Sequence, residues 1–137
     1  MHLRLDIAPA IETVRDYADD AVRNMQRVYG VGLDYSVDSL LHVDRVLAEW
    51  RDAGAPADAV TKSLYAFGSY AGEVLRQQEP GRWTEPPHAP HGDLDSLFLF
   101  VRLLDGREWA PIARTVAVFG DADAMPLHAS LKALLGV

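Results

Sequence analysis

Glu73 is the side chain of this 137-residue chain that most invites a chemical interpretation. It follows Gly68 and Gly72 in the stretch LYAFGSYAGEVLR, whose apolar residues recur at helical spacing, and it stands at the border of the apolar stripe. A half-buried carboxylate needs a partner, because an unpaired buried charge is costly. Two roles fit: a structural brace, which we favour, or a general acid or base, which half-buried carboxylates often supply in active sites.

Several groups are candidate partners for Glu73. Arg76 follows three residues later on the same helix, and Arg82 comes shortly after the helix ends. The Tyr35 hydroxyl and the backbone amides of the LDYS turn, residues 33–36, are the other candidates. We expect Glu73 to connect its helix to that turn.

Asp44 is the second carboxylate at an unusual position, because it lies four residues after Leu40 and borders the apolar face of its own predicted helix. If Asp44 and Glu73 faced each other across two helices, they would form the paired carboxylates of an acid–base site. Alternatively, each carboxylate holds an arginine. We favour the arginine.

His88 and His91 lie in the segment HAPHGDLD, close to Asp93 and Asp95. Neighbouring prolines and the lack of a helix or strand to fix the geometry favour a solvated loop over a metal site. The chain also has no cysteine, no G-x-S-x-G nucleophile motif, no P-loop and no G-x-G-x-x-G motif. We therefore expect no metal, no cofactor and no assembled catalytic residues.

The elements that must position these side chains follow from periodicity and from turn residues. Three helices are predicted first, then three short strands with an Asp105-Gly106 hairpin turn between the last two, then two short helices, the first of which has valines that would also suit a strand. The predicted helices are Pro9 to Tyr29, Ser36 to Gly54, Pro56 to Gln78, Ile112 to Phe119 and Leu127 to Leu135, and the predicted strands are Arg82 to Thr84, Leu97 to Leu104 and Arg107 to Ala110. This order predicts a single α+β domain over 1–137, with three N-terminal helices packed on a small antiparallel sheet and short C-terminal helices.

Gly68 and Gly72 deserve an explanation, because each glycine costs roughly 1 kcal/mol relative to alanine inside a helix. Two glycines in the third helix indicate that something comes close to its backbone. We expect the second helix or the sheet to pack there. The alternative is that a ligand or a partner's backbone approaches that face.

The overall composition restricts the class of protein. A formal net charge of −7, with no cluster of basic residues, argues against binding to nucleic acid. The longest apolar run, Leu97 to Val101, is far shorter than a membrane span, and the N-terminus does not have the pattern of a secretory signal. The absence of cysteine fits a reducing compartment. We expect a cytoplasmic protein.

Three stretches of the chain resemble a family of small uncharacterised bacterial domains. This family has an LDYS-x-[DE]-SL start, a G-x-Y-x-GE helix and a G-x-W strand. The matching positions are Leu33, Asp34, Tyr35, Ser36, Asp38, Ser39, Leu40, Asp44, Gly68, Tyr70, Gly72, Glu73, Gly81 and Trp83. The resemblance covers about half of the chain; it implies a fold and supplies no mechanism.

These observations favour a non-enzymatic binding or interaction module that acts through a surface near Tyr35, Tyr70 and Glu73. Asp44, Arg76 and Trp83 complete the set of candidate binding residues. The partner would be another protein, or a second copy of the chain bound through the amphipathic first helix. The alternative is a small enzyme that uses Glu73 and Asp44 for acid–base chemistry.

Overall fold

The computed structural model describes residues 10–86 and 98–137. Its elements are α1 (Val14–Tyr29), the 3-10 helix η2 (Val37–Ser39), α2 (Leu40–Asp52), α3 (Ala57–Gln78), β1 (Gly81–Thr84), β2 (Phe100–Leu103), β3 (Glu108–Trp109), α4 (Pro111–Gly120) and α5 (Leu127–Leu135). The predicted α+β class and the predicted order of helices, antiparallel sheet and short C-terminal helices are confirmed.

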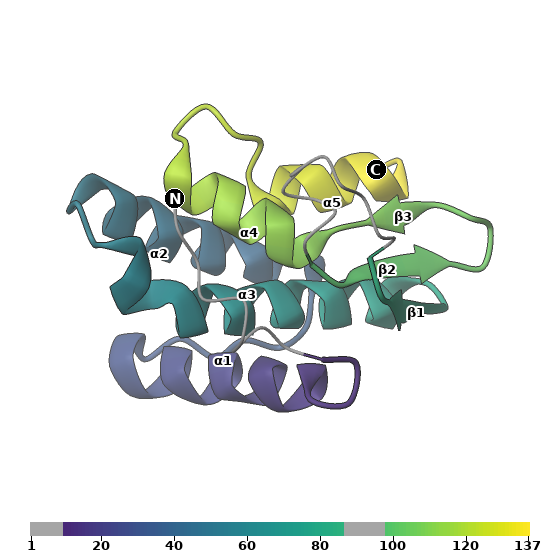
Figure 1. Cartoon of the computed structure of the whole chain (residues 1–137), viewed down its shortest axis with the longest axis horizontal. Coiled ribbons are helices and arrows are strands. Elements are labelled where there is room, and N and C mark those ends of the chain that lie inside the picture. The colour runs from purple at the N-terminus through teal and green to yellow at the C-terminus, as the bar shows by residue number, and fades with distance from the viewer. Residues whose placement is uncertain (1–9, 87–97) are drawn as a thin grey trace.

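The long helix α3 lies in the middle of the fold, as Figure 1 shows. Helix α1 packs along one side of α3, and α4 packs along the other side with α2 and α5 beyond it. The sheet lies at the C-terminal end of α3. Because α3 is covered on several sides, every residue from Leu64 to Leu75 is buried. None of the described helices has the length and apolar character needed to cross a membrane.

Helix α1 is shorter than predicted and buries a narrower stripe. It begins at Val14 and ends at Tyr29, and Gly30 after it takes the left-handed conformation expected of a helix stop. The predicted start at Pro9 lies outside the described residues. Its buried residues are Val14, Ala18, Ala21 and Met25, whereas Val28 and Tyr29, which follow the same apolar periodicity, are exposed. Helix α1 packs mainly on α3, so only one side of α1 is covered.

The second predicted helix begins with a separate turn. Ser36 is the N-cap, as predicted, and its Oγ accepts a hydrogen bond from the Ser39 amide at 3.1 Å. The residues that follow first form the 3-10 turn η2, and the α-helix starts only at Leu40. Residues 33–39 are therefore fixed by capping bonds before the regular helix begins.

The sheet has the order β1-β2-β3 and is antiparallel throughout. The Asp105-Gly106 turn is confirmed: Gly106 has φ 95°, and Asp105 Oδ1 accepts a bond from the Arg107 amide. Strand β2 comes from a nearly continuous apolar run, but Arg102 is exposed on it and forms an ion pair with Glu108 on β3. The strand is also shorter than predicted.

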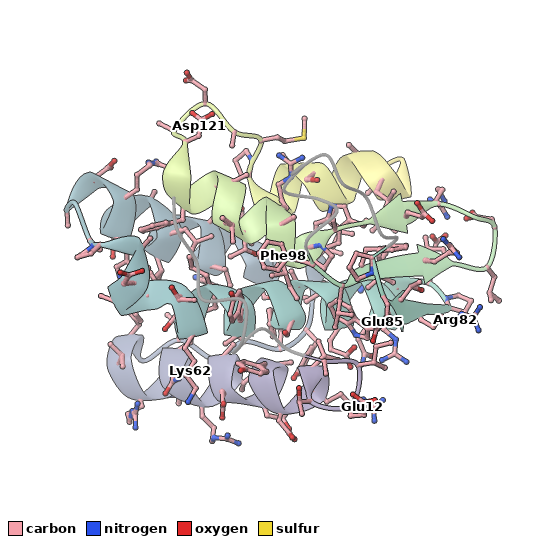
Figure 2. All side chains as sticks on the ribbon, viewed as in Figure 1. Glu12, Lys62, Arg82, Glu85, Phe98 and Asp121 are labelled. Atoms are coloured by element: carbon pink, nitrogen blue, oxygen red, sulfur yellow. The ribbon has the colours of Figure 1, made fainter. Side chains whose placement is uncertain are left out.

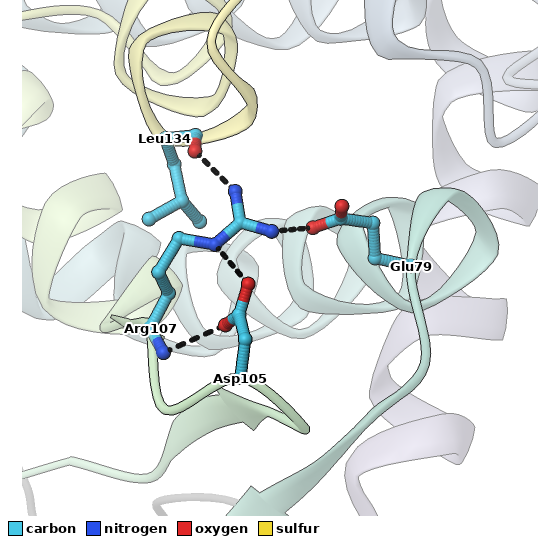
Figure 3. A network of polar contacts seen from close by, with 4 residues as sticks. All are labelled: Glu79, Asp105, Arg107 and Leu134. Atoms are coloured by element: carbon cyan, nitrogen blue, oxygen red, sulfur yellow. Dashed lines mark hydrogen bonds and ion pairs between the residues drawn. The ribbon is translucent and has the colours of Figure 1, made fainter.

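Arg107 joins three parts of the fold that are distant in sequence (Figure 3). Its guanidinium donates to Asp105 in the turn, to Glu79 after α3 and to the Leu134 carbonyl in the last turn of α5. An arginine suits this position, because its planar fork presents several donors at once. The bonds hold the tip of the sheet against both helices.

Candidate functional site

The carboxylate of Glu73 is buried, with 8% of the residue exposed, and its two oxygens have partners. Trp83 Nε1–H donates to Oε2 at 2.9 Å, and Arg76 donates to the same oxygen at 2.8 Å. Arg15 on α1 lies 3.5 Å from Oε1. Glu73 therefore connects α3 to strand β1 and to α1.

Gly72 makes the bond between Trp83 and Glu73 sterically feasible. A Cβ on Gly72 would lie 2.2 Å from two carbons of the Trp83 indole ring. Cβ atoms in proteins are essentially never found so close to another heavy atom. The indole thus lies directly on the helix backbone, with its nitrogen within reach of the next side chain, Glu73. The G-E pair of α3 and the G-x-W strand form one packing unit, to which Arg76 adds a bond to the Gly81 carbonyl.

Gly68 permits a second close contact on the same helix. A Cβ there would lie 2.5 Å from the Ile112 Cα, so the backbones of α3 and α4 come together at this point. The prediction that the protein itself packs against both glycines is confirmed. The identity of the neighbour was only partly right, because the sheet covers Gly72 while α4, rather than the second helix, covers Gly68.

Tyr70, and not Glu73, connects α3 to the LDYS turn. The Tyr35 amide donates to the Tyr70 hydroxyl at 2.8 Å, and that hydroxyl lies 2.6 Å from Ser39 Oγ, which donates to the Ser36 carbonyl. The Ser39 hydroxyl has one proton and donates it to the Ser36 carbonyl, so the Tyr70 hydroxyl is the donor in its bond with Ser39 Oγ. The prediction that Glu73 connects α3 to the LDYS turn is wrong, because Tyr70, one helical turn earlier, makes that connection.

Tyr35 is held in an unusual backbone conformation at this junction. Its φ is 63°, in the left-handed region that non-glycine residues rarely occupy, and its ring packs against that of Tyr70 with centroids 4.8 Å apart. Burial raises the pKa of the Tyr70 hydroxyl, and burial together with the nearby Asp19 carboxylate raises the pKa of Tyr35. Both hydroxyls stay protonated at neutral pH and act as hydrogen-bonding groups.

Asp44 has a different role from the two that the sequence suggested. Its carboxylate accepts hydrogen bonds from the Leu127 and His128 amides at 2.8 and 3.0 Å, and so caps the N-terminus of α5. His128 Nε2 also lies 2.9 Å from Asp38. Burial raises the pKa of Asp44 in spite of these bonds. Neither Glu73 nor an arginine is its partner, because an unsatisfied helix terminus competes for the same oxygens.

No metal centre is formed by the part of the chain that the structure describes, where no group of three or more His, Asp or Glu side chains could hold an ion. His88 and His91, together with Asp93 and Asp95, lie outside the described residues. The carboxylates of Glu73 and Asp44 have separate sets of partners, so the described structure does not bring them together as a pair.

A surface groove between α1 and α3 was not anticipated. One hollow of about 220 Å³ is lined mainly by apolar and aromatic side chains: Ala21, Met25, Val28, Tyr29, Trp50, Ala66 and Phe67, with Asn24, Arg27 and Ser63. A second, more polar hollow of about 260 Å³ adjoins it and shares Asn24, Ser63 and Ala66, with Tyr17, Asp20 and Lys62 completing its wall. Figure 2 shows Lys62 on α3, beside α1. We call the two hollows the α1–α3 groove.

The apolar end of the α1–α3 groove is built by the ends of two helices. Trp50, in the last turn of α2, stacks near Phe67 with ring centroids 5.7 Å apart, and its Nε1–H donates to the Tyr29 hydroxyl at 3.0 Å. Val28 is 62% exposed at the mouth. The sequence feature that could have indicated this groove is the presence of large side chains in the last turns of α1 and α2. Periodicity alone assigns these side chains to the core.

Comparison with models of protein families, with curated proteins and with solved structures finds no match to this chain. The resemblance carried by the LDYS, G-x-Y-x-GE and G-x-W motifs therefore stays a prediction. What the structure adds is a physical account of why these motifs occur together in one chain.

Proposed function

We propose that this domain is a protein-interaction module without catalytic activity, and that its contact surface is the α1–α3 groove. The observation that carries the proposal is the apolar hollow with Val28, Tyr29 and Trp50 at its mouth. The occupant we propose is an apolar side chain on a segment of another protein. A hollow of about 220 Å³ has room for one large side chain.

The composition of the hollow supports a protein partner. Tyrosine, tryptophan, phenylalanine, methionine and arginine are the residue types enriched at protein interfaces, and each of them contributes to this wall. Tryptophan, tyrosine and arginine also dominate the residues whose loss most weakens binding. The bond between Trp50 and Tyr29 fixes both rings before binding, which lowers the entropy that association costs.

The motif residues support a role without catalysis. Tyr70 and Glu73 are buried and bonded within the fold, and Asp44 is occupied by the backbone of α5. An enzyme that used Glu73 and Asp44 as an acid–base pair would need them to share a substrate, and their partners lie on different elements. We place the module in the cytoplasm, where a chain without cysteine needs no oxidative maturation.

Selection from a random peptide library displayed on phage tests this proposal with matched variants. Enriched peptides should bind the wild-type domain and lose about tenfold in affinity with Val28→Gln, because the contact with one aliphatic side chain is removed. The control is Leu104→Gln, which changes the same property at a leucine 83% exposed beyond β2. It should leave affinity unchanged.

Mapping of amide chemical shifts on the labelled domain gives the location of the bound peptide. Shifts should concentrate on Asn24, Val28, Tyr29, Trp50 and Phe67. The proposal is overturned if no peptide is enriched, or if the enriched peptides bind the Val28→Gln variant as tightly as the wild type and shift residues elsewhere.

A further inference from the structure

The outer face of α1 carries an ordered stripe of charge. Asp16, Asp20, Arg23 and Arg27 follow one another at steps of four, three and four residues, so they lie on one side of the helix. Ala18, Ala21 and Met25 face the core from the opposite side. The stripe reads acid, acid, base, base from the N-terminal to the C-terminal end of the helix.

This stripe is complementary to itself when two copies of α1 run antiparallel. About a midpoint between Ala21 and Val22, Asp16 stands opposite Arg27 of a second copy, and Asp20 stands opposite Arg23. The two remaining pairs follow by symmetry, so all four charges of each copy meet an opposite charge. A parallel arrangement would instead place like charges together.

The helix dipole explains only the two ends of the stripe. Asp16 lies in the first turn and Arg27 in the last, where acids and bases respectively are favoured. Asp20 and Arg23 lie in the middle of the helix, where the dipole has little effect. The spacing also puts like charges four residues apart, at Asp16 and Asp20 and again at Arg23 and Arg27, and of these two arginines only Arg23 stands at a favourable distance from acids within the helix, Asp19 and Asp20.

Three of the four side chains are exposed, Asp20 is partly buried, and the set is only partly paired. Asp20 bonds Arg23 within the helix, while Arg27 donates to the neutral Asn24 side chain at 2.8 Å. Among the residues that the structure describes, Asp16 and Arg27 have no ion-pair partner. Helix α1 is also the outermost helix on its side of the fold (Figure 1).

We infer that the domain forms a weak twofold dimer in which the charge stripes of two α1 helices pair antiparallel. The occupant of this face is a second copy of the chain, and the inference goes beyond the groove proposed above. Surface ion pairs are individually weak, so the dissociation constant should be on the order of 1 mM. Rising salt should weaken the dimer, because exposed charges are screened.

Sedimentation equilibrium on the full chain, up to about 1 mM protein, tests this inference with two charge-reversed variants. Asp16→Arg/Asp20→Arg makes the stripe wholly basic, and Arg23→Glu/Arg27→Glu makes it wholly acidic. Each variant alone should be monomeric. A mixture of the two should form a heterodimer about as tight as the wild-type dimer, since each charge of one stripe again meets an opposite charge on the other.

Arg45→Glu is the control, because it reverses an exposed charge on α2 outside the stripe and should leave the wild-type dimer intact. Circular dichroism checks that each variant is folded, and the single changes Asp16→Arg and Arg27→Glu repeat the experiment with one altered pair. A monomeric wild type, variants that dimerise alone, or a mixture that stays monomeric would each overturn the inference. Asp20 and Arg27 also stand in the wall of the α1–α3 groove, so the groove is tested separately by the peptide experiment with Val28→Gln, which leaves the charge stripe unchanged.

Discussion

Gly72, Glu73 and Trp83 show how a missing side chain can position a polar group. The indole ring occupies the space that a Cβ on Gly72 would fill, and in that position its nitrogen donates to the Glu73 carboxylate. Arg76 and Arg15 supply the compensating charge. A buried carboxylate with these partners has a structural role, because the loss of any one partner would leave part of its charge in the interior without a compensating hydrogen bond.

Gly72→Ala should destabilise the fold by about 3 kcal/mol, because overpacking and the loss of the Trp83–Glu73 bond outweigh the gain in helix propensity. Urea denaturation followed by tryptophan fluorescence measures the change. The matched control is Gly32→Ala, where the new Cβ would lie 3.7 Å from the Gln26 side chain, an ordinary contact. It should change stability by less than about 0.5 kcal/mol. Equal stability of the two variants would contradict the close approach of the indole.

At the scale of elements, α5 depends on a side chain that is 83 residues away in sequence. Asp44 on α2 accepts the first amides of α5, and Arg107 donates to the Leu134 carbonyl near its other end. A nine-residue helix is too short to be stable alone in water. Its ends are therefore fixed by the rest of the fold.

Asp44→Ala should cost about 1–2 kcal/mol and should raise hydrogen exchange mainly in Leu127–Leu135, because two amides of α5 lose their acceptor. Exchange followed by mass spectrometry gives both the size and the place of the effect. Asp38→Ala is the comparison: this carboxylate also contacts His128, but its side chain is 84% exposed, so its removal should cost well under about 1 kcal/mol. An equal effect of both changes would show that capping is not the role of Asp44.

At the scale of the whole molecule, polar groups join layers that apolar packing places side by side. Tyr70 joins α3 to the turn before α2, Glu73 joins α3 to the sheet and α1, and Arg107 joins the sheet to α3 and α5. Each of these bonds involves the central helix or the sheet at its end. Loss of one should therefore weaken the fold as a whole.

The stability of the domain should fall as pH rises above about 10, the ordinary pKa of tyrosine. Burial raises the pKa values of Tyr70 and Tyr35 in the folded state, so the unfolded chain loses these protons first. Ionisation then favours unfolding until the pH passes the raised values. Urea denaturation between pH 8 and pH 11, combined with tyrosinate absorbance, measures this slope.

Tyr70→Phe supplies the control for the alkaline slope. The variant should be less stable than the wild type at pH 8, because the Tyr35 amide and Ser39 lose a partner, and its stability should depend less on pH above about 10. An unchanged slope in this variant would assign the alkaline loss to other groups.

The sequence by itself determined most of the elements, because their signals are local. Ser36 as an N-cap, Gly30 as a helix stop and the Asp105-Gly106 turn act within a few residues, and the apolar spacing of residues 57–78 favours a helix whichever element packs against it. The two glycines of α3 also indicated a close contact before its partner was known, since their cost in a helix must be offset by packing.

Only the tertiary structure decided what each polar group contacts. Helical periodicity shows which face a side chain occupies, but the partner of Glu73 depends on where strand β1 meets α3, and the partner of Asp44 on where α5 begins. Val28 and Tyr29 follow the same periodicity as the core, yet they are exposed because α1 is covered on one side only. Packing between elements distant in sequence therefore determined that Glu73 and Tyr70 are buried with internal partners, and that Val28 and Tyr29 are exposed at the groove where we propose that a partner binds.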